Sequence, residues 1–147
     1  MARYRTVIDS PKPREELFPY LADFSNAQEW DPGVVRAERS DKGAVKVGSE
    51  FELVAAFMGR ETPLTYRVTA LDAPRSVTFR GENATVVSLD TITFADRPDG
   101  TRVTYDADLQ LKGVLKLGDP ALRLAFGKIG DKARDGLRDA VDGRVIS

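Results

Sequence analysis

The chain has no histidine and no cysteine among its 147 residues, so any acid–base chemistry must come from other side chains. Asp90, Tyr66 and Tyr105 are the leading candidates, because each follows the apolar alternation of a predicted strand. A carboxyl held against apolar surroundings has a raised pKa and can serve as a general acid or base. A tyrosine in the same place could orient the carbonyl or enol of a ligand through its hydroxyl.

The orientation of Asp90 stays open on the sequence alone. If Phe94 pairs near Val103 across the loop between them, alternation places Asp90 on the same inner face as Tyr105. The same alternation turns the apolar Leu89 outward, and a bulge at this point would reverse the parity. An inward Asp90 suits acid–base chemistry, whereas an outward one is a solvated surface group.

The two tyrosines also have a purely structural interpretation. Tyr66 and Tyr105 could be core residues whose hydroxyls are satisfied by neighbouring groups. Arg67 and Arg80 have the opposite parity and are predicted to lie on the surface.

Composition excludes several classes of function. A net charge of −1 argues against a nucleic-acid-binding protein. Without cysteine and histidine the sequence offers no zinc pattern, and it has no phosphate-binding loop or paired metal carboxylates, so we expect neither a metal nor another cofactor. The N-terminal residues lack the apolar run of a signal peptide, and no segment is long enough to span a membrane. A cytoplasmic protein is therefore expected.

The elements that must position these side chains follow one another without a linker, which predicts a single domain over residues 1–147. Residues 2–9 alternate as a first strand. Two short helices follow, the first containing Pro19 and the second ending at Asp31-Pro32-Gly33. From residue 34 to residue 111 the period changes to two, with turns between the runs, as is typical of antiparallel strands with one wet face.

The last segment is a long amphipathic helix. Asp119 and Pro120 suit its start, and apolar residues recur at steps of three and four as far as Ala140. Three glycines, at positions 127, 130 and 136, lie inside it, although each costs roughly 1 kcal/mol relative to alanine. They indicate either close packing against the sheet or space left for another molecule.

A sheet with one apolar face needs a cover, and only the last helix is long enough to provide it. A curved sheet around one helix is hard to fill with side chains, so a cavity is expected between them. Trp30, the only tryptophan, is expected to flank that cavity, although it could instead plug one end of a core. The phenylalanine-methionine pair in "AAFMGRE" is interpreted as a flexible lid, or else as a hairpin end tucked into the core. The predicted ligand-binding residues are Trp30, Phe51, Leu53, Phe57, Met58, Leu64, Tyr66, Val68, Val77, Phe79, Tyr105, Phe126 and Ile129.

Four phrases of the sequence, in order, resemble one family. "QEWDPGVV", "LDAPRSVTFRG", "DTITFADRPDGTRVTYDADLQLKG" and "DPALRLAFGKIGDKARDGLRDAV" resemble segments of the START-like, or SRPBCC, superfamily and its bacterial polyketide cyclase/dehydrase-like members. The resemblance implies an α+β helix-grip fold: a curved antiparallel sheet of about six or seven strands wrapped around a long C-terminal helix, with two short helices after the first strand. It also implies an internal cavity for hydrophobic molecules.

The expected function is therefore the binding of a small hydrophobic, lipid- or polyketide-like ligand in an internal cavity. One alternative is a polyketide cyclase, aromatase or dehydratase that works without a metal or an organic cofactor. A second alternative is a module that binds a protein partner. The sequence leaves the oligomeric state open between monomer and homodimer.

Overall fold

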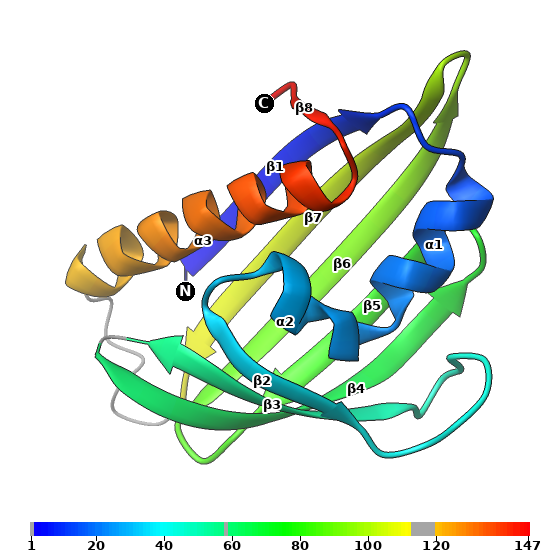
Figure 1. Cartoon of the computed structure of the whole chain (residues 1–147). Helices are drawn as coiled ribbons and strands as arrows, with labels where there is room; N and C mark the ends of the chain where they lie inside the picture. The colour runs from blue at the N-terminus through cyan, green and yellow to red at the C-terminus, as the bar shows by residue number, and fades with distance from the viewer. Residues whose placement is uncertain (1, 58, 113–119) are drawn as a thin grey trace.

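The computed structural model describes residues 2–57, 59–112 and 120–147, and Figure 1 shows the order of its elements. One curved antiparallel sheet carries three helices and a short 3-10 segment. The elements are β1 (Ala2–Ser10), α1 (Arg14–Ala22), η1 (Phe24–Asn26), α2 (Ala27–Trp30), β2 (Val34–Arg39), β3 (Glu50–Phe57), β4 (Arg60–Asp72), β5 (Ser76–Glu82), β6 (Val86–Arg97), β7 (Gly100–Leu111), α3 (Pro120–Ala140) and β8 (Arg144–Val145).

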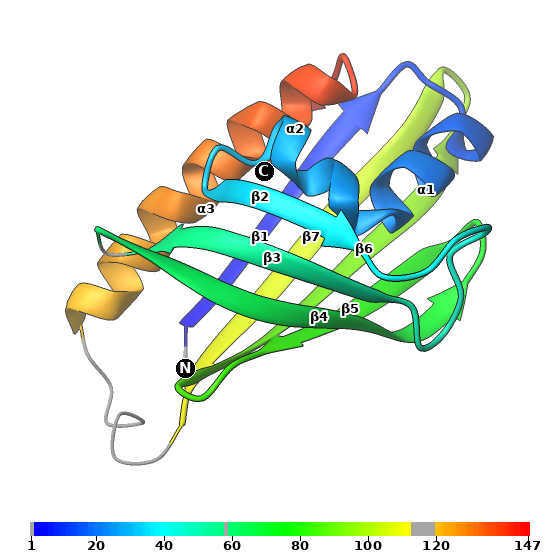
Figure 2. The same ribbon diagram turned by 60° about the horizontal axis from the view of Figure 1, so that its bottom comes forward.

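The described residues form an eight-stranded sheet in the order β2-β3-β4-β5-β6-β7-β1-β8. Consecutive strands pair as hairpins from β2 to β7, and β1 then adds to β7 with Ala2 opposite Leu109 and Ser10 opposite Thr101. Figure 2 shows how strongly β2 and β3 curve away from β6 and β7. The predicted fold class is confirmed. The strand beyond the expected six or seven is β8, a two-residue strand after the last helix.

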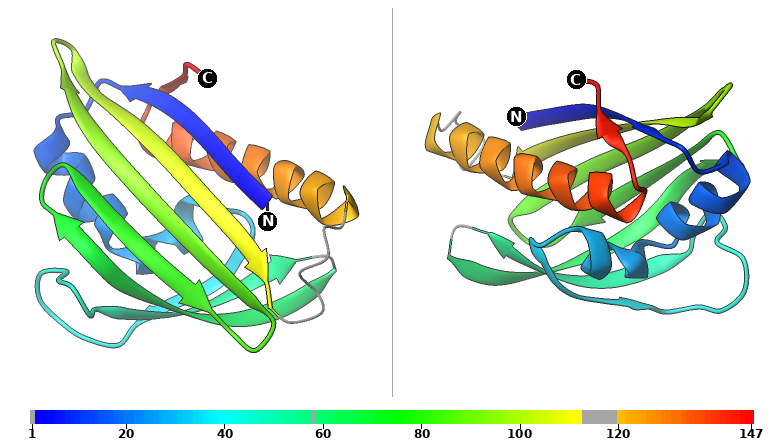
Figure 3. Two further views of the ribbon diagram at one scale, coloured as in Figure 1. Left: turned by 180° about the vertical axis from the view of Figure 1, so that it is seen from behind. Right: turned by 45° about the horizontal axis from the view of Figure 1, so that its top comes forward.

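The helices lie inside the curl of the sheet. In the right-hand view of Figure 3, α3, α2 and α1 lie between the part of the sheet that holds β1 and the part that holds β3 and β4. The side of α3 that faces inward buries Leu137, and Val141 directly after the helix is buried too. This is the amphipathic pattern expected of a helix that covers a sheet.

Two of the three glycines in α3 allow close contact with neighbouring elements. A Cβ at Gly130 would lie 2.3 Å from the ring of Tyr4, and a Cβ at Gly136 would lie 1.7 Å from the carbonyl oxygen of Trp30. At Gly127 a Cβ would meet nothing within 4 Å. Close packing therefore accounts for Gly130 and Gly136, and open space lies beside Gly127.

The half of the sheet beneath α1 and η1 has a filled aromatic core. Phe24 stacks on Phe79 with ring centroids 4.3 Å apart, and its ring lies 6.4 Å from that of Phe51. Leu17 and Leu21 of α1 are buried in the same core cluster.

This filling corrects part of the sequence-based prediction of the cavity lining. Phe51, Val68, Val77 and Phe79 are fully buried but do not line the cavity described below. The alternating pattern of the strands shows only that these four side chains face inward. The pattern does not show that α1 and η1 cover the part of the sheet where these side chains lie.

Candidate functional site

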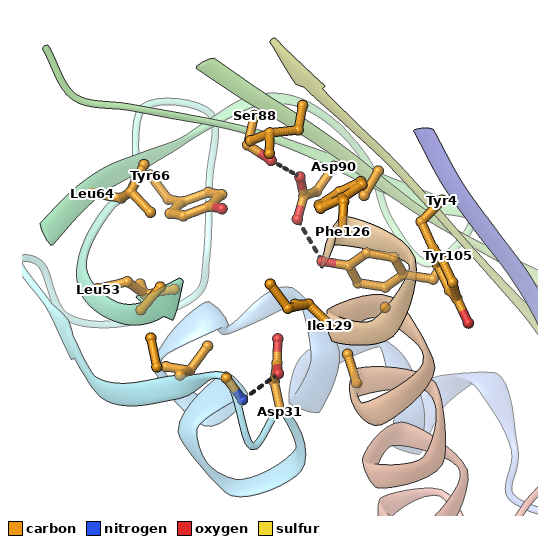
Figure 4. Close-up of a pocket in the computed structure, with 18 of the residues that line it drawn as sticks. Tyr4, Asp31, Leu53, Leu64, Tyr66, Ser88, Asp90, Tyr105, Phe126 and Ile129 are labelled. Carbon is orange, nitrogen blue, oxygen red and sulfur yellow. Dashed lines mark hydrogen bonds between the residues drawn. The ribbon is translucent and has the colours of Figure 1, made fainter. Parts of the chain in front are cut away.

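A cavity of about 320 Å³ lies between α3 and the concave face of the sheet. The expected gap between the sheet and the last helix is therefore present in the structure. Its walls are mostly apolar, and Figure 4 shows the polar side chains among them. The lining residues come from β1, η1, α2, α3 and all strands from β2 to β7 except β5, together with Asp31, Gly33 and Thr85 from the turns.

The cavity wall formed by β6 and β7 carries a hydrogen-bonded cluster. The Tyr105 hydroxyl donates to Asp90 Oδ2 at 2.5 Å, and the Ser88 hydroxyl donates to Asp90 Oδ1 at 2.7 Å. Asp90 is 5% exposed. Burial raises the pKa of Asp90, although the two hydrogen bonds act in the opposite direction by stabilising the charged form. The same burial, together with the Asp90 charge, raises the pKa of Tyr105 well above its usual value.

Asp90 faces inward because the alternation of β6 is unbroken. The pairing of β6 with both neighbours runs without a register shift from Val86 onward, so the bulge considered from the sequence does not occur. Leu89 points outward as a consequence and is 44% exposed. Single exposed leucines are common on protein surfaces. An outward Leu89 is therefore compatible with an inward Asp90.

Tyr66 reaches the same region from β4 because residue 81 lacks a side chain. Gly81 pairs with Tyr66 on one side and with Ser88 on the other. A Cβ at Gly81 would lie 2.5 Å from the Tyr66 ring, so the ring lies directly over this glycine. Tyr66 is 8% exposed, and the Ser88 side chain lies close enough to its hydroxyl to act as a hydrogen-bonding neighbour. Figure 4 shows the Tyr66 hydroxyl directed into the cavity.

Asp31 supplies a second carboxyl from the opposite wall, where it ends α2. Its Oδ1 accepts a hydrogen bond from the backbone N–H of Gly33 at 2.8 Å. Burial raises the pKa of Asp31 to about 6, assisted by the nearby charge of Asp90 and partly offset by the Gly33 bond. Figure 4 shows its carboxyl pointing into the space between Leu53 and Ile129.

Sequence reasoning missed Asp31 as a site residue. The Asp-Pro-Gly triplet predicts a turn, and Asp31 does cap that turn. The only signal for a second role was its position directly after Trp30, the residue expected to flank the cavity.

Most of the other predicted lining residues are where they were expected. Trp30 is 3% exposed, packs edge-on against Tyr105 at 5.8 Å and lines the cavity. Leu53, Leu64, Phe126 and Ile129 also line it. The side chain of Phe57 and the whole of Met58 lie outside the described residues, and so does the proposed lid.

The part of the chain that the structure describes contains no cluster of three or more acidic, histidine or cysteine side chains able to hold a metal ion. Over the same residues, no helix has the length and apolar character needed to cross a membrane.

A curved antiparallel sheet closed over a C-terminal helix, with a lined cavity between them, defines a START-like helix-grip protein. The chain belongs to the family described as polyketide cyclase / dehydrase and lipid transport, whose model matches residues 1–142. No curated protein sequence matches it.

Solved structures support the same fold. A START superfamily protein from Mycobacterium smegmatis is 12% identical with a TM-score of 0.78, and the match covers 97% of this chain and 98% of that one. A protein from Thermus thermophilus is 17% identical with a TM-score of 0.75, and the match covers 95% of each chain. The di-domain ARO/CYC StfQ of the steffimycin biosynthetic pathway is 12% identical with a TM-score of 0.70, and the match covers 96% of this chain and 50% of that one.

Proposed function

We propose that this protein binds a small, largely apolar molecule carrying at least one polar group inside the cavity between α3 and the sheet. The observation that carries the proposal is the cavity itself, about 320 Å³ with mostly apolar walls and a few convergent polar groups. Removing apolar ligand surface from water contributes about 25 cal/mol per Å². The few polar groups on the cavity walls then orient the ligand rather than supplying most of its affinity.

Blocking the cavity should weaken the binding of a neutral fluorescent probe. Ala133 lines the cavity from α3, so Ala133→Phe places a ring in the space the probe needs. We expect the affinity for 1-aminoanthracene to fall by about tenfold or more, since an overlapping ring removes the contacts of apolar burial. Probe emission and quenching of Trp30, the only tryptophan, provide two independent readouts.

The matched control is Lys132→Phe, which adds the same ring on the exposed side of the same helix. It should bind the probe like the unmodified protein. Equal binding by the Ala133→Phe variant would place the probe elsewhere and contradict the proposal. Native mass spectrometry of the purified protein adds a test without a probe, because a tightly held molecule would appear as a discrete added mass.

The enzyme alternative has a specific observation in its favour. Asp90 is a buried carboxyl with a raised pKa, and the Tyr105 hydroxyl lies 2.5 Å from it beside the cavity. That arrangement suits proton transfer next to the carbonyl of a polyketide-like ketone. A partner-binding module, by contrast, needs no internal cavity, so this alternative has the least support.

Proton transfer can be tested with a neutral ketone that fits an apolar cavity. If Asp90 acts as the base, the protein should accelerate deuterium exchange at the α-carbon of 2-tetralone in D₂O by about tenfold or more over buffer. Asp90→Asn should remove the acceleration, whereas Asp99→Asn in the exposed β6–β7 turn should retain it. An exchange rate equal to that of buffer would leave only the binding function.

A further inference from the structure

The cavity carries an excess of negative charge. Asp31 and Asp90 both line it, from opposite walls. Among the described lining residues Arg134 is the only basic one, and its guanidinium is already paired with Asp131 at 3.3 Å and Asp135 at 3.1 Å. The described residues therefore supply no free cation to offset the two cavity carboxyls.

Two polar groups of the cavity remain available to a ligand. Asp31 Oδ1 accepts the Gly33 N–H, but Oδ2 accepts no hydrogen bond within the described residues. The Tyr66 hydroxyl, on a side chain that is 8% exposed, is directed into the cavity. Its hydrogen-bonding neighbour Ser88 already donates to Asp90, so the Tyr66 oxygen can still accept a hydrogen bond from a ligand. Asp90 differs, because Tyr105 and Ser88 already donate to both of its oxygens.

The remaining walls are rich in aromatic rings. Trp30, Tyr66, Tyr105 and Phe126 all line the cavity, and the rings of Trp30 and Tyr105 are 5.8 Å apart. Aromatic faces attract cations through their quadrupoles, most strongly where water is excluded. Carboxylates and aromatic rings together form a surface that favours a positive ligand group and disfavours a negative one.

We propose that the ligand of this cavity is an apolar molecule bearing a single protonated amine, held by Asp31 with Tyr66 as a second hydrogen-bond partner. This inference rests on the proposed binding function and adds the chemical class of the ligand. The ammonium N–H groups donate to Asp31 Oδ2 and to the Tyr66 hydroxyl oxygen, and the Asp90 carboxyl faces them from across the cavity. Carboxylate ligands such as fatty acids are disfavoured, because they would place another acidic group beside Asp31 and Asp90 in the same low-dielectric space.

The pH dependence follows from the groups that face Asp31. The titratable and charged groups that line the cavity with Asp31 are Tyr4 from β1, Tyr66 from β4, Asp90 from β6, Tyr105 from β7 and Arg134 from α3. The tyrosines stay protonated and Arg134 stays charged between about pH 5 and pH 8, so they contribute no change of charge in that range. Because the pKa of Asp31 is raised to about 6, protonation below this value removes the partner of the ammonium group.

Three ligands with one ring skeleton test the proposal by displacing 1-aminoanthracene. At about pH 7.5, 2-naphthylmethylamine should bind about tenfold to hundredfold more tightly than 2-naphthalenemethanol, and 2-naphthoate should not displace the probe, since hydrogen bonds between charged groups are the stronger ones. The higher affinity for the amine than for the alcohol should disappear in Asp31→Asn. It should also disappear in the unmodified protein as the pH falls through about 6, while the affinity for the alcohol stays unchanged. Asp99→Asn, in an exposed turn, should change none of these affinities.

The outcomes separate this inference from the binding proposal. Binding of the naphthoate as tight as that of the amine, or an amine advantage that survives in Asp31→Asn, would overturn the ligand class and leave the binding function intact. The ligand class is also overturned, and the binding function left intact, if the probe binds and none of the three ligands displaces it. If the probe itself does not bind, both proposals are wrong.

Discussion

Replacing Asp31 by asparagine should stabilise the protein at neutral pH by about 2–3 kcal/mol, because the native state raises the pKa of this carboxyl from 3.8 to about 6. A carboxyl that holds its proton more tightly in the native state than in the unfolded state destabilises the native state once it ionises. The loss therefore begins as the pH rises above the unfolded value of 3.8 and is complete above about 6. Asparagine carries no charge at any of these pH values and keeps an oxygen for the Gly33 N–H.

Thermal unfolding followed by circular dichroism at two pH values checks this result. Near pH 7.5 the variant should melt roughly 5–10 °C higher than the unmodified protein, and below about pH 4 the two curves should coincide. The control Asp99→Asn lies on the exposed β6–β7 turn and should melt like the unmodified protein at both values. Equal melting temperatures near pH 7.5 would mean that the Asp31 carboxyl is solvated in the native state.

The Asp31 carboxyl destabilises the fold, and asparagine could cap the same turn equally well. The presence of aspartate at this position therefore needs another explanation. Asn and Asp are similar in turn chemistry, so the charge itself is not required for the Gly33 hydrogen bond. Strongly perturbed carboxyls in cavities are characteristic of functional sites. If Asp31→Asn raises stability and lowers amine affinity together, the same charge accounts for both effects.

The sequence predicts the fold and about half of the site. Alternation and turn chemistry locate the strands, and period-two parity places Tyr66 and Tyr105 on the inner face. Parity leaves the orientation of Asp90 open, and the structure brings all three residues together around the cavity. What local patterns cannot supply is the relation between distant segments. Asp31 faces the same cavity as Asp90 only because α2 packs against α3, and no spacing along the chain encodes that contact.

The same limit explains the residues that were expected in the cavity and lie in the filled core. Inward parity is identical for Phe79, which is covered by Phe24, and for Leu64, which faces the cavity. The difference depends on how far α1 and η1 extend across the sheet. That extent is a tertiary property, set by packing rather than by the pattern of either strand.

The contact between α2 and α3 that brings Asp31 into the site depends on Gly136, so Gly136→Ala should destabilise the protein although alanine is the better helix former. A Cβ there would lie 1.7 Å from the Trp30 carbonyl oxygen, and this backbone atom cannot rotate out of the way as a side chain can. Overpacking of this kind costs about 1–3 kcal/mol, which exceeds the roughly 1 kcal/mol that alanine gains over glycine in a helix. To relieve the clash, α3 must move away from Trp30 and Asp31, so amine affinity should fall as well.

Gly127→Ala on the same helix is the matched control and should have the opposite sign. A Cβ at Gly127 meets nothing within 4 Å, so only the helix propensity changes and stability should rise by up to about 1 kcal/mol. Denaturant unfolding of the two variants measures both signs in one experiment. If Gly136→Ala were as stable as Gly127→Ala, α2 and α3 would not be in close contact, and the position of Asp31 in the cavity wall would lose its structural basis.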